Sequence, residues 1–382
     1  RAFSGDSMSI PTFRPCFDEE EVEAVREVLL SGWVGPGPKV EAFEKKFAEY
    51  VGTRFALSMN SCSAALFASM KVIGVEDKEV VTTAQTFVST NHAILQNGGI
   101  PVFADIEPDT LNIDPDSVAD RVTDKTGAIV VVHHGGHPCD MDRINEIADA
   151  RGIPVVEDAA HAAGTLYKGR RAGSLGTTGC FSFHALKNVS TGDGGMLTTD
   201  DEAIAERVKN LRWMGITRST YDRFRKNGRQ RAWEYDVDEV GYKFHMNDLN
   251  AAIGIVQLGK LESTNAARRE VAVQYRAAFK DLPWVEVLDE KEYARSSHQS
   301  FVMLAEDRDR LIEHLAEKGI DAGVHYRPNH MYSVYEPYKR SLPVTEAVWT
   351  RMVTLPMFPA MTNDDVNQVI DAVRGFQPSA SS

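Results

Sequence analysis

The 382-residue sequence has little cysteine and no long apolar run. Its four cysteines are widely spaced and form no CxxC pair, which argues against a disulfide framework and predicts a reducing, cytoplasmic environment. They are Cys16, Cys62, Cys139 and Cys180. No segment is apolar over the length needed to span a bilayer, and no basic stretch followed by an apolar core precedes the first motifs. We therefore expect no membrane partner.

The sequence also has no dense basic cluster. Its 42 lysines and arginines stand against 55 aspartates and glutamates, which gives a net charge of −13. A nucleic-acid partner is therefore not expected. Anionic small molecules remain suitable ligands, because helix N-termini and a few local cations are enough to bind them.

One segment, VVHHGGHPCDMD (131–142), gathers three histidines and a cysteine, the residue types that bind zinc. No second cluster with zinc-like spacing accompanies it, and the segment follows an apolar strand, where a loop is expected. We predict no metal site.

Short apolar, β-branched runs alternate with helical stretches up to about residue 250. The expected helices include 63–72, 89–96 and 142–150, and the expected strands are 55–59, 79–83, 101–104, 128–132, 154–157, 180–183 and 196–199. This alternation predicts parallel βαβ units and an α/β domain. No helix separates the last two strands, which predicts a hairpin at the edge of the sheet.

A long helical pattern over residues 247–281 leads into a second region with mixed helices and strands. Residues 218–238 are polar and aromatic without periodicity, which predicts a long loop. The expected organisation is a tail (1–10), a large α/β domain (11–250), a smaller α+β domain (251–376) and a frayed end (377–382).

The segment FSFHALKNVSTGDGG (181–195) contains the most informative residue, Lys187. It follows a strand-like stretch, where desolvation lowers the pKa of an amine and lets it form a Schiff base with a carbonyl. Asp158, in VVEDAAHAAG (155–164), ends another apolar strand. A lysine that forms an imine and a carboxylate that keeps a pyridine nitrogen protonated are the two groups that pyridoxal phosphate requires. The plainer alternatives are a solvated lysine and an aspartate that caps the next helix.

Ligand-binding groups gather at the carboxyl ends of parallel strands in α/β proteins. Four candidate groups follow expected strands here: residues 60–63, residues 85–87, Asp158, and the pair Ser182 and Lys187. Because the carboxyl ends of parallel strands meet at one edge of a sheet, we expect these groups to form one site.

Several motifs together resemble the DegT/DnrJ/StrS family of pyridoxal-phosphate sugar aminotransferases. They include NSCSAAL (60–66), TAQTFVSTNHAI (83–94), GCFSFHALKNVSTGDGGML (179–197), VGYKFHMNDLNAAIGIVQL (240–258) and GIDAGVHYRP (319–328), and the resemblance runs from about Pro11 to Val373. It implies the fold-type I aminotransferase fold, with a large domain built on a mixed, mostly parallel sheet and a smaller α+β C-terminal domain.

The resemblance also implies roles for single residues. Lys187 matches the lysine that carries the cofactor and shuttles a proton, and Asp158 matches the carboxylate facing the ring nitrogen. Phe87 matches the aromatic residue that stacks on the ring. His161 matches a position near the 3′ oxygen, although a polar core residue is an equal alternative.

The phosphate is expected at the N-terminus of the helix that Cys62 and Ser63 begin. The family usually has Gly-Thr at these two positions; Ser63 keeps a hydroxyl group, and the Cys62 thiol is expected to pack. Ser182 matches a hydroxyl that reaches the phosphate. Lys243 matches an Asn or Lys that reaches the phosphate of the partner subunit, which implies a homodimer with shared active sites. Asp193 replaces the usual glutamate of a GEGG-like run.

The function implied is transfer of an amino group, with glutamate as donor, to a keto group of a nucleotide-linked deoxy sugar, through pyridoxal phosphate and pyridoxamine phosphate. Four residues are expected at the substrate: His184, His325, Tyr326 and Arg327. Alternatives are a cyclitol-ketone aminotransferase, a sugar dehydratase, in which family members have typically replaced the lysine by histidine, and a non-catalytic regulatory protein.

Overall fold

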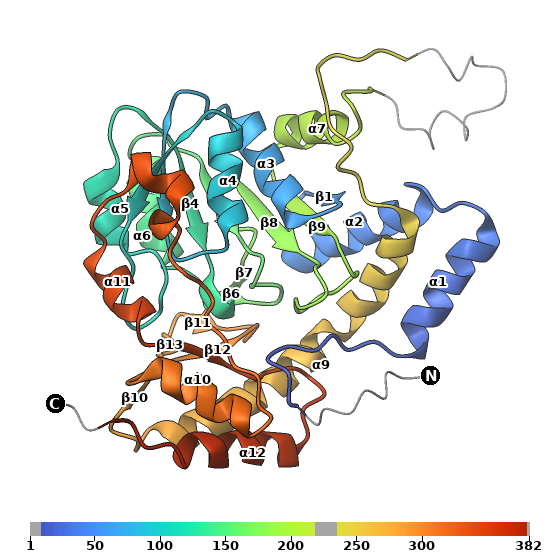
Figure 1. Cartoon of the computed structure of the whole chain (residues 1–382). Helices are drawn as coiled ribbons and strands as arrows, with labels where there is room; N and C mark the ends of the chain where they lie inside the picture. The colour runs from blue at the N-terminus through green and yellow to red at the C-terminus, as the bar shows by residue number, and fades with distance from the viewer. Residues whose placement is uncertain (1–8, 218–234, 380–382) are drawn as a thin grey trace.

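The computed structural model describes residues 9–217 and 235–379 and contains a large and a small β-sheet, each covered by helices (Figure 1). Residues 218–234 of the predicted loop, the start of the predicted tail and the last three residues lie outside the described residues. No helix in the described ranges has the length and apolarity needed to cross a membrane.

The large sheet has seven strands in the order β1-β9-β8-β5-β4-β2-β3. All strands run in one direction except β9, which is antiparallel to both of its neighbours. Their bounds are β1 (Phe55–Met59), β2 (Glu79–Thr83), β3 (Ile100–Ala104), β4 (Thr126–Val132), β5 (Val155–Asp158), β8 (Thr178–Ser182) and β9 (Gly195–Thr199). The expected strands match to within two residues at each end, and the α/β fold with a mostly parallel sheet is confirmed.

The predicted hairpin edge is wrong. Strands β8 and β9 do pair antiparallel, but β9 lies inside the sheet, between β8 and β1. Leu197 of β9 is paired with Cys180 on one side and with Leu57 on the other. Local sequence shows that two strands are close along the chain, whereas the edge position depends on pairing with a strand more than a hundred residues away.

Helices cover both faces of the large sheet because alternate strand residues point to opposite faces. In β4, Ala128 and Val130 pack in one core cluster, whereas Ile129 and Val131 pack in another. The first face carries α3 (Cys62–Ile73), α4 (Val88–Gln96) and α7 (Glu202–Leu211). The opposite face carries α2 (Pro38–Val51), α5 (Pro115–Arg121), α6 (Met141–Asp149) and the start of α9 (Asp248–Phe279).

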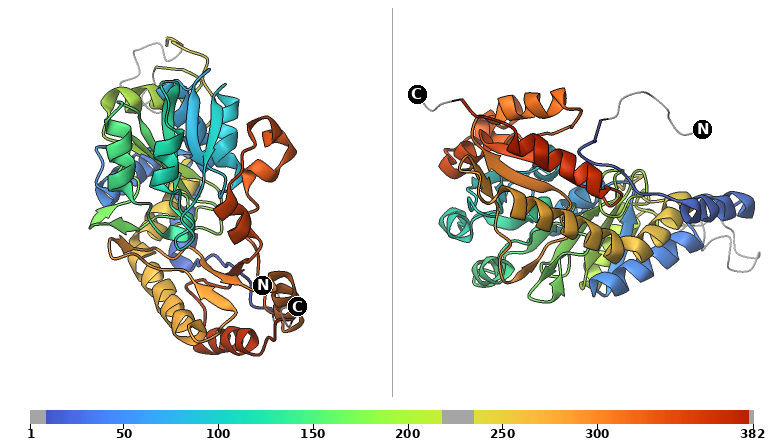
Figure 2. Two further views of the ribbon diagram at one scale, coloured as in Figure 1. Left: turned by 90° about the vertical axis from the view of Figure 1, so that its left-hand side faces the viewer. Right: turned by 90° about the horizontal axis from the view of Figure 1, so that it is seen from below.

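The 32-residue helix α9 joins the two sheets and confirms the predicted long helix (Figure 2). Its first half packs against α1 (Glu19–Ser31) and α2, and its second half contributes Tyr275 and Phe279 to the core of the small sheet. The small sheet consists of β10 (Val285–Val287), β12 (Phe301–Ala305) and β13 (Met352–Leu355), beside α10 (Arg308–Glu317) and α12 (Asn363–Arg374). The predicted domain boundary after residue 250 falls inside α9, and the domain limits stay a prediction.

The remaining elements are short. A third sheet is formed by β6 (Leu166–Tyr167), β7 (Arg170–Arg171) and β11 (Ala294–Arg295). The short helices are η1 (His134–Gly136), η2 (Asn329–Met331), η3 (Ser333–Tyr338) and α11 (Pro343–Trp349).

Asp248, at the start of α9, caps the N-terminus of α2. Helix α2 begins at Pro38, and its own cap residue, Gly37, has no side chain to accept a hydrogen bond. The buried carboxylate of Asp248 accepts hydrogen bonds from the N–H groups of Gly37 (2.9 Å), Lys39 (3.2 Å) and Val40 (3.0 Å). A negative charge at a helix N-terminus also meets the positive end of the helix dipole. The start of α9 is therefore tied to the start of α2.

We predict that Asp248→Ala lowers the free energy of unfolding by about 2–3 kcal/mol, because buried N–H groups lose their acceptor and a helix loses its cap. The midpoint of chemical denaturation at fixed protein concentration measures this change. Asp120→Ala, on an exposed position of α5, is the control and should move the midpoint little. Equal midpoints for the two variants would contradict the capping role.

Candidate active site

A pocket of about 310 Å³ lies at the carboxyl ends of the parallel strands. Val132, Asp158 and Ser182, which are the last residues of β4, β5 and β8, all line it. Ten of the twelve candidate residues line this pocket: Cys62, Ser63, Phe87, Asp158, His161, Ser182, His184, Lys187, His325 and Tyr326. The expected convergence of the strand ends on one site is thus observed, and the roles of the individual residues stay predictions.

Lys187 is held by the loop that connects β8 to β9. The loop closes where the Phe183 N–H donates to the Gly194 carbonyl (2.8 Å), and the Lys187 N–H donates to the His184 carbonyl (2.9 Å). The next residue, Asn188, is buried and donates to the Asn265 side chain (2.7 Å) and to the Ser297 carbonyl (3.0 Å). These contacts fix the loop to α9 and to the segment before β12, so that the lysine side chain enters the pocket from a supported backbone.

Burial lowers the pKa of Lys187 to about 8, while the nearby Asp158 and Cys62 act in the opposite direction. About a tenth of the amine is therefore uncharged at pH 7, far more than for an ordinary lysine. The prediction that desolvation makes this amine a nucleophile agrees with the direction of the shift.

Asp158 is buried at the end of β5, and burial raises its pKa. Two donors oppose that shift: the Thr90 hydroxyl on one carboxylate oxygen (2.7 Å) and the Ala160 N–H on the other (3.1 Å). Residues 159–165 contain turns and no helix, so the alternative role of Asp158 as a helix cap is wrong. A buried carboxylate of this kind suits a cationic partner in the pocket.

The first turn of α3 presents backbone N–H groups to the pocket. Ser61 is the cap residue, and its hydroxyl accepts from the Ala64 N–H (3.1 Å). Gly195 approaches this turn closely, since a Cβ atom there would lie 2.4 Å from the Ser61 carbonyl carbon and 2.5 Å from the Cys62 nitrogen. Ser63 is exposed toward the pocket and Ser182 lines it from β8. Free N–H groups, the helix dipole and two hydroxyls together form a cradle suited to a phosphate.

Cys62 is buried beside this cradle. Burial raises the pKa of its thiol well above the ordinary value, and the charge of Asp158 acts in the same direction. The thiol therefore stays protonated, as expected for a packing residue.

Aromatic side chains line part of the pocket and are called here the aromatic wall: Phe13, Phe87, His325 and Tyr326. Phe87 precedes α4 and keeps 54% of its surface exposed, so a face of its ring is available to a ligand. Its ring centroid lies 5.7 Å from that of Tyr326, which comes from the segment between α10 and η2. His325 packs edge-on against Phe13 (5.3 Å) and contacts the Thr354 hydroxyl through Nδ1 (3.0 Å). Residues distant in sequence thus enclose one side of the pocket.

Two candidates lie outside this pocket. The Lys243 amine is 4.8 Å from the centre of the Trp213 ring, and its backbone carbonyl accepts from Asn60 (3.1 Å). Arg327 is exposed, with its guanidinium over the ring of Tyr332 (5.2 Å) and donating to the Met331 carbonyl (3.1 Å). Within one chain, neither residue reaches the pocket.

Some pocket residues were missed by the sequence analysis. Thr86, which lines the pocket, was detectable because it lies in the segment 85–87 that follows an expected strand; its hydroxyl is 2.8 Å from that of Thr90, which donates to Asp158. Phe13 and Gln299 have no local signal, since the fold brings them to the pocket from remote segments.

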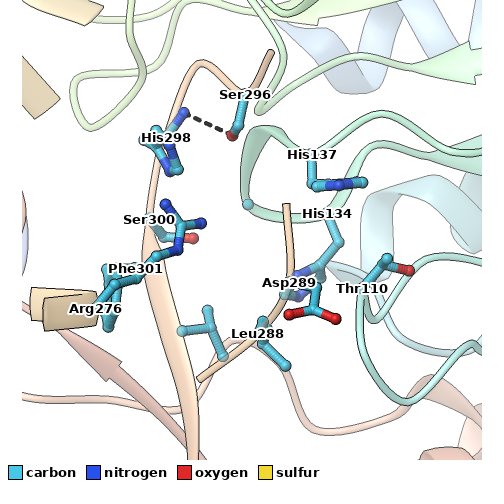
Figure 3. Close-up of a pocket in the computed structure, with 12 residues that line it drawn as sticks. Thr110, His134, His137, Arg276, Leu288, Asp289, Ser296, His298, Ser300 and Phe301 are labelled. Carbon is cyan, nitrogen blue, oxygen red and sulfur yellow. Dashed lines mark hydrogen bonds between the residues drawn. The ribbon is translucent and has the colours of Figure 1, made fainter. Parts of the chain in front are cut away.

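The histidines of segment 131–142 form hydrogen bonds within the fold. The ring of His133 bonds to buried Glu157 (2.9 Å), that of His134 to the His325 carbonyl (2.9 Å) and that of His137 to the Pro138 carbonyl (2.8 Å). A second cavity of about 40 Å³ lies beside this segment, between His134 and His298 (Figure 3). Within residues 9–217 and 235–379, no group of three or more His, Cys, Asp or Glu could hold a metal ion.

The fold and this pocket define the class of fold-type I aminotransferases that depend on pyridoxal phosphate. A family model described as "DegT/DnrJ/EryC1/StrS aminotransferase family" matches residues 15–374. The chain belongs to this family and is a pyridoxal-phosphate-dependent transaminase.

Relatives match the chain along nearly its whole length. The spore coat polysaccharide biosynthesis protein SpsC of Bacillus subtilis (strain 168) is 41% identical over 97% of this chain and 98% of its own. The aminotransferase TlmJ from Streptoalloteichus hindustanus is 36% identical with a TM-score of 0.90, over 96% of this chain and 98% of TlmJ. The sugar aminotransferase CalS13 from Micromonospora echinospora is 30% identical with a TM-score of 0.89, over 96% and 100%. Another structural neighbour, Spr1654 from Streptococcus pneumoniae, has a PLP-form and a PMP-form.

We predict that Gly195→Ala weakens binding of pyridoxal phosphate by roughly tenfold or more, because the added methyl group displaces the backbone of the first turn of α3 and misdirects its N–H groups. Titration of the apo protein by absorbance measures the affinity. Gly259→Ala is the control, since a Cβ atom at Gly259 meets nothing within 4 Å. Unchanged affinity in the Gly195 variant would show that the close approach does not shape the cofactor site.

Proposed function

We propose that the protein transfers an amino group from an amino acid, with L-glutamate as the donor, to a keto group of a nucleotide-linked deoxy sugar in amino-sugar biosynthesis. The observation that carries the proposal is the placement of Lys187, with its pKa lowered to about 8, in one pocket with the buried Asp158. The sugar specificity is supported by the names of two relatives, the polysaccharide biosynthesis protein SpsC and the sugar aminotransferase CalS13.

The pocket residues fit pyridoxal phosphate. The N–H groups of the first turn of α3, with the hydroxyls of Ser63 and Ser182, would hold the phosphate, and Asp158 would hold the ring nitrogen in its protonated form. The ring of Phe87 would cover one face of the pyridine. When bound, the cofactor supplies an electron sink for the carbon that loses a proton.

The residues of the chain bind and orient the cofactor and move protons. The amine of Lys187 would hold the cofactor through its aldehyde carbon until an amino donor takes its place. When free, this amine would move the proton between the substrate carbon and the C4′ atom of the cofactor, a role that needs an uncharged amine near neutral pH. Thr90 and Ala160 keep the Asp158 carboxylate directed into the pocket.

His184, His325 and Tyr326 line the pocket and are proposed to contact the acceptor. Arg327 is exposed and does not line the pocket of its own chain, so its predicted contact with the substrate is not part of this proposal. We also propose that the enzyme is a cytoplasmic homodimer in which Lys243 completes the phosphate site of the partner subunit. A dehydratase activity is disfavoured because Lys187 is present.

We predict that Lys187→Ala lowers transamination by roughly a thousandfold or more, since the variant lacks both the covalent attachment of the cofactor and the proton shuttle. Two readings test this: turnover with glutamate and a panel of keto-sugar nucleotides, and the visible absorbance of the loaded protein, which glutamate should bleach in the wild type. Lys46→Ala, at an exposed position of α2, is the control. Turnover within about tenfold of wild type, a barrier change of only about 1.4 kcal/mol, would show that another lysine acts.

We predict that Lys243→Ala strongly impairs activity and that mixing it with Lys187→Ala restores part of it. If Lys243 is donated across a dimer, a heterodimer of the two variants contains one site with both lysines intact. Exchange of subunits must be demonstrated with differently tagged chains. Exchange without returned activity, or a fully active monomer by light scattering, would contradict donation in trans.

A further inference from the structure

The side chain of Tyr326 lines the pocket and is surrounded by other aromatic rings. Its ring lies among Phe87, His161 and His325, with centroid distances of 5.7, 6.1 and 5.2 Å. Its backbone carbonyl accepts from the Gln85 side chain (3.1 Å). Its hydroxyl oxygen lies 3.2 Å from Nε2 of His161, close enough for a hydrogen bond. The direction of that bond decides what the hydroxyl can do for a ligand.

The direction follows from the other ring nitrogen of His161. Nδ1 lies 3.3 Å from the backbone nitrogen of Gly135, and a backbone N–H can only donate. Nδ1 is therefore an acceptor and carries no proton, so the ring is neutral and its single proton is on Nε2. Burial, which lowers the pKa of His161 well below 6.5, agrees with this assignment. His161 consequently donates to Tyr326, and the tyrosine oxygen accepts.

The Gly135 donor cannot easily turn away. Gly135 and its neighbour Gly136 have φ values of +60° and +95°, a conformation that other residues rarely adopt. The carbonyl of Gly135 is also held, because it accepts a hydrogen bond from the Gln299 N–H (3.0 Å). A Cβ atom at Gly136 would lie 3.0 Å from the His161 carbonyl oxygen, which shows how tightly the turn packs on His161. The fold thus sets the proton position on His161 through a fixed turn.

The proton of the Tyr326 hydroxyl then remains for a ligand, because no other partner of this oxygen is found in the described part of the chain. We propose that Tyr326 is a hydrogen-bond donor, directed by Gly135 and His161, for an anionic oxygen in the pocket of Lys187. This inference rests on the proposed function, in which two such oxygens enter the pocket. They are the 3′ oxygen of the cofactor and the carboxylate of the amino donor.

The first experiment needs no cofactor and tests the hydrogen-bond order alone. Histidine labelled with ¹⁵N is incorporated into the apo protein, and the signals of His161 are assigned by their loss in His161→Gln. We expect an unprotonated Nδ1 and a protonated Nε2. The reverse tautomer, or a doubly protonated ring at neutral pH, overturns the proposal, whatever the enzyme's substrate proves to be.

The second experiment compares Tyr326→Phe, which keeps the ring and removes the hydroxyl, with the wild type after loading with pyridoxal phosphate. If the acceptor is the 3′ oxygen, the pH at which the visible absorbance changes rises by about one unit, because the oxygen then holds a proton more strongly. If the acceptor is the donor carboxylate, the absorbance is unchanged and the KM for glutamate rises roughly tenfold to a hundredfold with little change in kcat.

Tyr332→Phe is the matched control, since Tyr332 follows on the same segment and does not line the pocket. It should change neither the absorbance nor the KM. A Tyr326 variant that also leaves both unchanged overturns the proposal. Failure of the wild type to take up pyridoxal phosphate would instead count against the proposed function. The result of the tautomer measurement would still hold, because that measurement uses no cofactor.

Discussion

The parallel pairing of β5 with β8 is the constraint on which the site depends. Asp158 is paired with Cys180, so the last residue of β5 and the loop that carries Lys187 leave the sheet at the same edge and in the same direction. The insertion of β9 beside β8 then brings Gly195 against the first turn of α3. The relative positions of the lysine, the carboxylate and the phosphate cradle therefore follow from one strand order.

The pocket holds its ionisable groups in a buried environment that disfavours their charged forms. Burial shifts the pKa values of Lys187, Asp158 and His161 toward their neutral forms, and the α3 cradle offers N–H groups without a charged side chain. Such a site costs less to bury than one with fixed ions. A ligand that has both a cationic ring and an anionic phosphate would place opposite charges beside Asp158 and at the α3 cradle.

Much of this site could be predicted from sequence because its signals are local. Lys187 and Asp158 each follow an apolar run, and the ends of the expected strands were correct to within two residues. The remaining features depend on contacts between distant segments. The place of β9 is set by β1, the cap of α2 is supplied by Asp248, and Phe13 and Gln299 reach the pocket from other parts of the fold. Periodicity and residue type do not report such pairings.

The continuous helix α9 couples the position of the small sheet to that of the large sheet, because it packs on both. With 32 residues it is about 48 Å long, so a tilt of only one degree at one end displaces the other by about 0.8 Å. The end held by Asp248 is anchored on the large sheet, and the far end packs against the small sheet, beyond which the segment with His325 and Tyr326 returns to the pocket. Loss of the Asp248 hydrogen bonds would therefore displace the aromatic wall, although none of the residues that form this wall would be changed.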